Sequence, residues 1–490
     1  MSILRHAKQC LSSQSKYTHL NAFVSLADRT AVLSYAESAD NAIHTSKPDA
    51  PFGDLVAIKD NICTVQLPTT AASGALKSFT SPYDATVVKQ LREAGAIIAG
   101  KTNMDEFGMG SHSTHSYFGP VKQLGNQAEE LSVGGSSGGS ALAVALGQCT
   151  TALGTDTGGS VRLPAAYTGI VGFKPSYGLL SRWGVIAYAN SLDTIGIFSS
   201  QVEQARTLFT TLNTHDPQDP TSLSQSTRSR LGRTLPNTLR IGIPLEYNIS
   251  TLDPTIKSTW LHTLRTLESA GHTLYPVSLP ATRHALSAYY ILAPAEASSN
   301  LAKYDGVRYG SRAEGIDGTP TSVLFAKTRG QNLGQEVQRR ILLGAFSLSA
   351  QAIDNYFIQA QKIRRLVQGD FNNVFATPNP LLTSETSVAS REGVDVIVCP
   401  TAPTPAPLYS SIADQDSIDA YMNDVFTVPA SLAGLPAISV PVRIPTSRDL
   451  SEEQEDGSGR KESVGIQIIG QYGEDEFVLD VAQKIVEMST

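Results

Sequence analysis

The chain has 490 residues, of which 41% are hydrophobic and 17% are charged. This composition excludes an intrinsically disordered protein, because disordered chains are poor in apolar residues and rich in net charge. The 38 basic and 45 acidic side chains leave a formal net charge of −7 at pH 7. A general nucleic-acid binder carries a basic excess, so we expect any contact with RNA to be local or made through a partner.

Four widely separated cysteines argue against both a metal centre and a disulfide framework. They form no Cys-x-x-Cys pair that would indicate zinc, and they are too few for a disulfide scaffold. No apolar run approaches the roughly 20 residues that span a bilayer. We therefore expect no metal site in this chain and no membrane insertion. The cysteines are Cys10, Cys63, Cys149 and Cys399.

Residues 1–50 are predicted to form a helical N-terminal segment, and its first residues have two interpretations. Arg5, Lys8 and Lys16 precede every acidic residue, and several serines surround them. An Arg-, Lys- and Ser-rich start without acids is typical of an organellar transit peptide. An ordinary surface helix over Ser2–Leu11 accounts for the same residues.

Residues 55–200 are rich in glycine and poor in charge, and short strands alternate with helices along them. Apolar strands are predicted at Leu55–Ile58 and at Ala96–Ala99. Apolar residues at helical spacing predict a helix over Ala85–Ala94, and a run of small residues predicts one over Ala141–Leu146. This alternation indicates an α/β layer fold.

The second half of the chain continues the alternation between polar loops. Leu239–Ile243 and Thr273–Val277 are predicted strands, and Thr251–Ala270 is a predicted helix. Stretches dense in Ser, Thr, Pro or charged residues, without apolar spacing, are predicted to be loop inserts. These inserts cover residues 214–237, 377–393 and 445–463.

Three segments carry residue types suited to acyl transfer: Lys59 after an apolar strand, and the glycine-serine runs at residues 134–140 and 154–160. Glycine-rich turns at helix starts leave backbone N–H groups free to bind an anion or an oxyanion. A serine beside such donors is placed as a nucleophile. A lysine serves as its base if burial keeps it neutral. Spacing alone does not show that Lys59 meets Ser160, and a single glycine-serine run is more often a flexible turn.

Two other motifs have the pattern of a binding site without its context. Residues 95–102 fit G-x-x-x-x-G-K-[ST], but a helix precedes them and their middle is an apolar strand, which disfavours a phosphate loop. We expect Lys101 instead to support the loop at residues 103–107. His112 and His115 lack a third metal ligand in a helical frame, so we expect polar loop residues. The chain has no G-x-S-x-G elbow.

Residues 134–166 resemble the signature of the amidase signature family, whose catalytic triad is Ser-cis-Ser-Lys. Lys59 matches the family's lysine, Ser136 its bridging serine and Ser160 its nucleophile. The resemblance implies an α/β fold, namely an α/β/α sandwich with a large mixed central β-sheet covered by helices. It also implies that residues 51–490 form a single amidase signature domain.

The resemblance further implies how the chemistry is stabilised. In the family the bridging serine follows a cis peptide bond and relays a proton between lysine and nucleophile. Backbone N–H groups just before the nucleophile form the oxyanion hole, and those of Thr157, Gly158 and Gly159 occupy that position. This chain needs no metal or cofactor for such chemistry.

Within the family the chain is most similar to the A-type subunits of tRNA-dependent glutamine amidotransferases. The matching stretches are residues 100–110, 173–178, 296–306, 336–344, 421–424 and 429–441. In that group an arginine holds the α-carboxylate of glutamine and an aspartate holds its α-amino group, and Arg340 and Asp424 occupy these positions. Tyr289 is expected to help close the glutamine pocket. Arg339 and Tyr290 stay open as alternatives from sequence alone.

The resemblance implies a glutaminase subunit that supplies ammonia to its partners. A B-type subunit would bind ATP and magnesium, make most of the tRNA contact and convert Glu-tRNA(Gln) to Gln-tRNA(Gln). A small C-type or analogous subunit would join them. The basic, serine-rich start then favours the mitochondrial matrix over the cytoplasm. Three alternatives stay open: a free-standing amidase of the same family that acts on small amides, a non-catalytic scaffold and, remotely, a P-loop ATPase.

Overall fold

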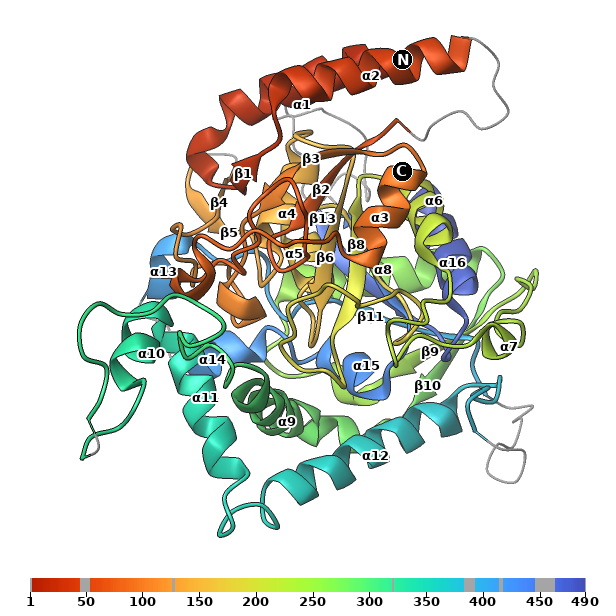
Figure 1. The fold of residues 1–490 in the computed structure, drawn as a ribbon. Coiled ribbons are helices and arrows are strands. Elements are labelled where there is room, and N and C mark those ends of the chain that lie inside the picture. The colour runs from red at the N-terminus through yellow and green to blue at the C-terminus, as the bar shows by residue number, and fades with distance from the viewer. Residues whose placement is uncertain are drawn as a thin grey trace.

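A mixed β-sheet of 11 strands runs through the centre of the molecule, and helices pack on both of its faces (Figure 1). The computed structural model describes residues 2–44, 53–125, 128–319, 321–382, 393–413, 417–445 and 463–489. Most of each predicted insert at 377–393 and 445–463 therefore lies outside the described residues. The predicted α/β fold around a large mixed sheet is confirmed.

The strands combine parallel units with antiparallel neighbours. Their order across the sheet is β1 (Phe23–Leu26), β3 (Ile97–Thr102), β2 (Leu55–Lys59), β6 (Thr151–Asp156), β8 (Thr194–Ser199), β7 (Val171–Lys174), β12 (Ala437–Arg443), β13 (Ser463–Ile469), β11 (Val396–Pro400), β9 (Arg240–Pro244) and β10 (Thr273–Val277). β2 runs parallel to β3 and β6, and β9 runs parallel to β10 and β11. The other neighbours pair antiparallel. A separate hairpin consists of β4 (Lys122–Leu124) and β5 (Glu130–Ser132).

Sixteen α-helices are present in the described part of the chain. They are α1 (Ile3–Lys16), α2 (Arg29–His44), α3 (Thr86–Glu93), α4 (Gly138–Ala145), α5 (Arg162–Thr168), α6 (Val202–Leu212), α7 (Gln225–Arg228), α8 (Pro254–Ser269), α9 (Ala285–Asn300), α10 (Ala326–Asn332), α11 (Gln335–Ser347), α12 (Phe357–Val374), α13 (Tyr409–Ala413), α14 (Ser417–Met422), α15 (Val428–Ala433) and α16 (Asp475–Met488). Within the described ranges, none of these helices is long and apolar enough to cross a bilayer.

Strand β2 shows how the sheet separates two hydrophobic layers. Val56 and Ile58 belong to the larger core, and Leu55 and Ala57 belong to the smaller one. Successive side chains of a strand point to opposite faces of a sheet, so each core fills one face. Helices α3, α6, α8, α9, α12 and α16 contribute to the larger core, and α1, α2 and α4 contribute to the smaller one. Because β2 is buried on both faces, it is a continuous apolar run ending in Lys59.

The predicted strands at 55–58, 96–99, 239–243 and 273–277 are present, as are the helices predicted at 85–94 and 251–270. The second of these helices starts late, at Pro254, because the Asp253 carboxylate caps it by accepting a hydrogen bond from the Thr255 N–H at 2.8 Å. The helix predicted from Ala141 begins three residues earlier, since the glycine-serine turn forms its first turn. The predicted loop at 214–237 holds the single-turn helix α7.

The N-terminal helix α1 is packed against the body of the protein rather than lying free on its surface. Ala7, Cys10 and Leu11 are buried. The Ser13 hydroxyl donates to the Leu146 carbonyl at 2.7 Å. The predicted helix at Ser2–Leu11 is therefore present but longer, and one of its faces belongs to the smaller core.

Candidate active site

Lys59 lies at the end of β2, where the strand delivers its side chain into a buried cluster of hydroxyl groups. Its ammonium nitrogen lies 2.8 Å from Ser136 Oγ, 2.7 Å from Ser137 Oγ and 2.9 Å from Thr155 Oγ1. The side chain is fully buried, and no carboxylate contacts it directly within the described residues. The lysine and bridging serine matched from the sequence are therefore neighbours in space.

Burial lowers the pKa of Lys59 from its ordinary value of 10.5 to about 7. The negative charges of Asp105, Asp156 and Asp193 act in the opposite direction, but the effect of burial outweighs them. A lysine with a pKa near 7 is unprotonated in a large fraction of molecules at neutral pH. It is thus suited to accept a proton from a hydroxyl group.

The turn that carries Ser136 is held by Asp105. The peptide bond between Gly135 and Ser136 is cis. The Asp105 N–H donates to the Ser136 carbonyl at 3.1 Å, and the Asp105 carboxylate accepts from the Ser113 N–H at 2.9 Å. A Cβ on Gly135 would lie 2.3 Å from this carboxylate and 2.6 Å from the His112 nitrogen. Only glycine fits here, because two other segments approach the backbone too closely.

Ser160 follows the glycine-rich loop that leaves β6, and it lies beside the Ser136 turn. The Ser137 N–H donates to the Ser160 carbonyl at 3.3 Å, and Ser160 keeps a small exposed fraction of 9%. Among the described residues, the N–H groups of Thr157, Gly158 and Gly159 donate to no protein acceptor. Such unpaired donors are available to a developing negative charge.

A buried ion pair that sequence reasoning missed holds both ends of this loop. Asp156 precedes the loop and Arg162 follows it, and Arg162 Nη2 lies 2.9 Å from Asp156 Oδ1. The Val161 N–H also donates to the Asp156 carboxylate at 3.1 Å. Burial acts to raise the pKa of Asp156, but the charge and hydrogen bonds of Arg162 outweigh it and lower that pKa. The signal was present in the sequence, because two opposite charges flank the serine in an otherwise uncharged stretch.

Arg340 lies in α11 and is 3% exposed. Its Nε donates to Glu336 Oε1 at 2.8 Å, and its Nη1 donates to the Tyr188 hydroxyl at 2.8 Å. The rings of Tyr188, Tyr290 and Tyr421 surround its guanidinium, with centroids 5.9, 5.3 and 5.3 Å from Cζ. The arginine is thus a buried cation in a box of tyrosines.

The structure separates the two arginines that the sequence left open. The side chain of Arg339 is 52% exposed and pairs with the outer oxygen of Glu336, whereas that of Arg340 is 3% exposed. Both arginines, with Ser111 and Tyr421, line a cavity of about 280 Å³. Only Arg340 of the two presents a buried guanidinium.

Asp424 lies on the other side of the tyrosine box, against the loop before Ser160. Its Oδ2 accepts from the Ser111 hydroxyl at 3.1 Å and from the Tyr290 hydroxyl at 3.4 Å. A Cβ on Gly159 would lie 2.6 Å from its Oδ1. Burial raises the pKa of Asp424 to about 7. A carboxyl group and a guanidinium therefore lie around one site next to the nucleophile loop.

Both tyrosines that the sequence offered reach this region. Tyr290 stacks on Tyr421, with ring centroids 3.8 Å apart. Tyr289 packs on the oxyanion loop, where a Cβ on Gly158 would lie 2.6 Å from its Cζ. Tyr289 therefore contacts the loop, and Tyr290 contacts Asp424.

One expectation about a neighbouring residue is wrong. Lys101 does not support the loop at 103–107, because it is fully buried and donates to the Ile62 carbonyl at 2.7 Å and to the Thr69 hydroxyl at 2.8 Å. His112 and His115 are loop residues, as predicted. His112 is 3% exposed, and its Nδ1 lies 2.8 Å from the Ser132 hydroxyl.

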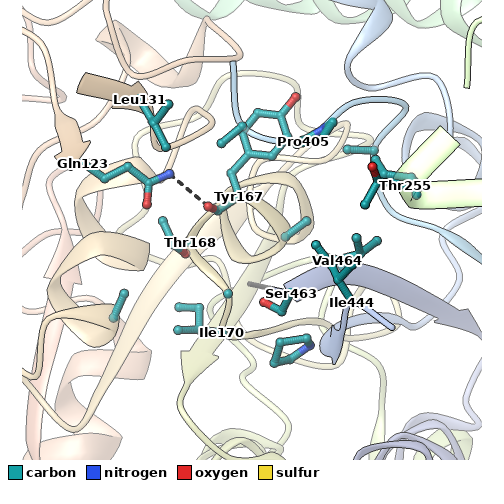
Figure 2. A pocket seen from close by; sticks show the side chains of 18 of the residues that line it. Gln123, Leu131, Tyr167, Thr168, Ile170, Thr255, Pro405, Ile444, Ser463 and Val464 are labelled. Atoms are coloured by element: carbon teal, nitrogen blue, oxygen red, sulfur yellow. Dashed lines mark hydrogen bonds between the residues drawn. The ribbon is translucent and has the colours of Figure 1, made fainter. Parts of the chain in front are cut away.

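A second cavity, of about 640 Å³, is lined by a different set of residues (Figure 2). Tyr167, Ile170 and Val464 line it, and the Gln123 amide donates to the Tyr167 carbonyl at 2.9 Å (Figure 2). None of the three triad positions lines this cavity. Within the described ranges, no group of three or more His, Cys, Asp or Glu side chains is placed to hold a metal ion.

Comparison with known proteins places this fold and site in a family. The model of the amidase family, described as Amidase, matches residues 8–479, so the chain belongs to the amidase family. It is 56% identical over 512 residues to the A-type subunit of the mitochondrial glutamyl-tRNA(Gln) amidotransferase of Coccidioides posadasii, with 100% of both chains covered. The protein of the same name from Emericella nidulans is 56% identical over 511 residues, with 99% of both covered.

Solved structures agree with the family. The crystal structure of the A-type subunit of the glutamyl-tRNA(Gln) amidotransferase from Thermotoga maritima has a TM-score of 0.68 and 35% identity, covering 89% of this chain and 83% of that one. A crystal structure described as an amidase has a TM-score of 0.76 and 25% identity, with 100% and 97% covered. The predicted resemblance to the amidase signature family is confirmed.

Proposed function

We propose that this chain is the glutamine-hydrolysing, A-type subunit of a mitochondrial glutamyl-tRNA(Gln) amidotransferase. The full-length identity to mitochondrial subunits of that name supports the proposal. The observation that carries it is the placement of a buried cation, Arg340, and a buried acid, Asp424, beside the loop of Ser160. A simple amide needs no such pair, whereas an amino acid needs one fixed partner for each of its charges.

The nucleophile is activated through a hydroxyl relay. Neutral Lys59 accepts the proton of Ser136, and Ser136 takes the proton of Ser160 as the Ser160 oxygen attacks the side-chain amide carbon of glutamine. The oxyanion that forms accepts hydrogen bonds from the unpaired N–H groups of the loop 157–159. The 2.8 Å contact between Lys59 and Ser136 supports the first step of this relay.

The remaining steps return every proton. The relay delivers the proton from Lys59 to the amide nitrogen, the carbon–nitrogen bond breaks, and ammonia leaves a glutamyl ester on Ser160. Water then loses a proton to the same relay and attacks the ester. Glutamate leaves as Ser160 regains its proton, and Lys59 is neutral again.

Glutamine is held by its two α-substituents. Arg340 binds the α-carboxylate with the part of its guanidinium that Glu336 and Tyr188 do not occupy. Asp424 binds the α-ammonium group, whose positive charge favours the ionised carboxylate and so offsets the effect of burial. Tyr289 closes the site over the oxyanion loop.

The ammonia passes to a B-type subunit, which binds ATP and Mg²⁺ and converts Glu-tRNA(Gln) to Gln-tRNA(Gln). A small C-type or analogous subunit completes the assembly. In this proposal the chain itself holds no cofactor. The net charge of −7 fits a subunit that leaves most of the tRNA contact to its partner. The mitochondrial relatives and the basic, serine-rich start support the matrix as its location.

The test is release of glutamate and ammonia from glutamine by the full chain, alone and co-purified with its partner subunits. We expect Ser160→Ala to abolish this release. Ser199→Ala, which removes a buried hydroxyl bonded to the Gln201 carbonyl outside the site, serves as the matched control and should be active. Ready hydrolysis of simple amides without glutamine hydrolysis would instead establish a free-standing amidase. Unchanged function of the complex with Ser160→Ala would establish a scaffold.

A further inference from the structure

Tyr188 contacts Arg340 of the proposed glutamine site and, through Asp193, the loop before Ser160. It lies in the connection between β7 and β8 and is 3% exposed. Its hydroxyl accepts the 2.8 Å hydrogen bond from Arg340 Nη1, while Glu336 occupies Arg340 Nε. Within the described residues, Nη2 makes no hydrogen bond to the protein. The guanidinium is therefore fixed on two sides and open on the third.

The backbone of Tyr188 leads from there to the oxyanion loop. Its N–H donates to Asp193 Oδ2 at 2.9 Å, and the neighbouring Ala189 N–H donates to the same oxygen at 3.0 Å. The other oxygen, Asp193 Oδ1, accepts from the Thr157 hydroxyl at 2.8 Å. Asp193 is 4% exposed, so water competes little for these hydrogen bonds. One carboxylate thus ties Tyr188 to the first residue of the oxyanion loop.

The next residue of the loop is covered by a different tyrosine. A Cβ on Gly158 would lie 2.6 Å from Tyr289 Cζ and 2.8 Å from the Tyr289 oxygen. Tyr188 is therefore tied to the loop at Thr157, through Asp193, while Tyr289 packs on Gly158.

We propose that Tyr188 is a positioning residue that couples occupation of the carboxylate clamp at Arg340 to the geometry of the oxyanion loop. This inference rests on the proposed function. A bound α-carboxylate fixes the open side of Arg340, and Arg340 fixes Tyr188. Tyr188 and Asp193 then hold Thr157 where its N–H meets the oxyanion. An amide without an α-carboxylate does not contact the open side of Arg340, so it does not fix Arg340 and Tyr188. The enzyme then rejects it in the chemical step as well as in binding.

The experiment compares two substrates on the complex of the full chain with its partner subunits. Glutamine carries the α-carboxylate, and 4-aminobutanamide is the same molecule without it. In Tyr188→Phe we expect kcat for glutamine to fall about tenfold or more, the effect of one lost hydrogen bond to a charged group, with a smaller change in KM. The rate of 4-aminobutanamide hydrolysis should change by less than about twofold, because that substrate has no α-carboxylate to contact Arg340. Tyr472→Phe, which removes another buried tyrosine hydroxyl, should change neither.

Two outcomes would overturn the coupling. A rise in KM for glutamine with unchanged kcat would limit Tyr188 to binding, and an equal loss for both substrates would show a merely structural role. Asp193→Asn keeps the shape of the link between Tyr188 and Thr157 and gives an independent result. It should lower kcat for both substrates, since it acts directly on Thr157, and full activity would contradict the link. If the unaltered complex hydrolyses both amides equally well, the proposed function itself fails, and the inference fails with it.

Discussion

Two buried lysines on adjacent strands have different contacts, and we expect these contacts to give them different roles. Lys59 ends β2, and Lys101 lies in β3, paired in register with Ile58. Both are fully buried, and burial lowers the pKa of each. Lys59 contacts hydroxyl groups, whereas Lys101 Nζ lies 3.7 Å from Asp60 Oδ1. Lys59, which has no carboxylate partner, is placed to act as a base, whereas Lys101 has the Asp60 carboxylate as a partner.

Replacing Lys59 by methionine should have the largest effect. We expect glutamine hydrolysis to fall about 10³-fold or more, because the relay loses its proton acceptor. The unfolding free energy at pH 7 should stay the same or rise. The pKa of Lys59 is about 7 in the folded chain against 10.5 ordinarily, so the unfolded chain binds more protons between these values, and this lysine reduces stability as the pH falls through that window. Steady-state assays and urea unfolding measure the two quantities. A large loss of stability would contradict the different roles of Lys59 and Lys101.

Lys101→Met should have the opposite effect to Lys59→Met, with a loss of stability and little change in activity. It leaves the Asp60 carboxylate buried without its cation, so we expect the unfolding free energy to fall by about 3–5 kcal/mol. Activity per folded molecule should be close to normal, since Lys101 contacts none of the triad positions. Urea unfolding followed by active-site titration of the folded fraction checks both. Activity lost with full stability would place Lys101 in the chemistry.

Arg339 and Arg340 are a second pair of cations that differ in burial, since the Arg340 side chain is 3% exposed and that of Arg339 is 52% exposed. We expect Arg340→Lys to raise KM for glutamine about 10- to 100-fold, because an ammonium group cannot keep the hydrogen bonds of the guanidinium to Glu336, Tyr188 and the substrate together. Arg339→Lys should change KM less than about twofold, since this side chain is half exposed. Steady-state kinetics with glutamine decide between them, and equal effects would reassign the clamp.

The smallest expected effect concerns how glutamine hydrolysis depends on pH. Activity requires Lys59 neutral, so kcat should rise with pH through about 7 and become flat above it. Asp424, whose pKa burial raises to about 7, must ionise to bind the α-ammonium group, so kcat/KM for glutamine should rise over the same range. In Asp424→Asn the rise in kcat should remain. Its disappearance would assign that limb to Asp424 instead of Lys59.

The sequence predicted the scaffold of the site well where the signal is local. Apolar runs placed β2 and β3, and a run of small residues placed α4 apart from its first three residues. Family motifs then singled out Lys59, which its residue type and position after a strand did not distinguish from Lys101. The decisive difference between the two is the Asp60 carboxylate, and its reach to Lys101 is set by strand pairing.

Contacts between distant segments were out of reach of the sequence. Tyr188 and Arg340 are 152 positions apart in the chain, yet they form one hydrogen bond. His112 has no local feature that predicts its contact with Ser132. The missed pair of Asp156 and Arg162 is a different case. The two residues are close in sequence, and their opposite charges in an otherwise uncharged stretch could have predicted the contact.

The proposed relay depends on Lys59 losing its proton near pH 7 in the folded chain. An NMR titration of the Ser160→Ala protein labelled at the lysine side-chain carbons tests this directly, with Lys59→Met identifying the signal. We expect a signal that titrates near pH 7, well apart from surface lysines. A Lys59 signal that stays that of a charged lysine up to pH 10 would contradict it.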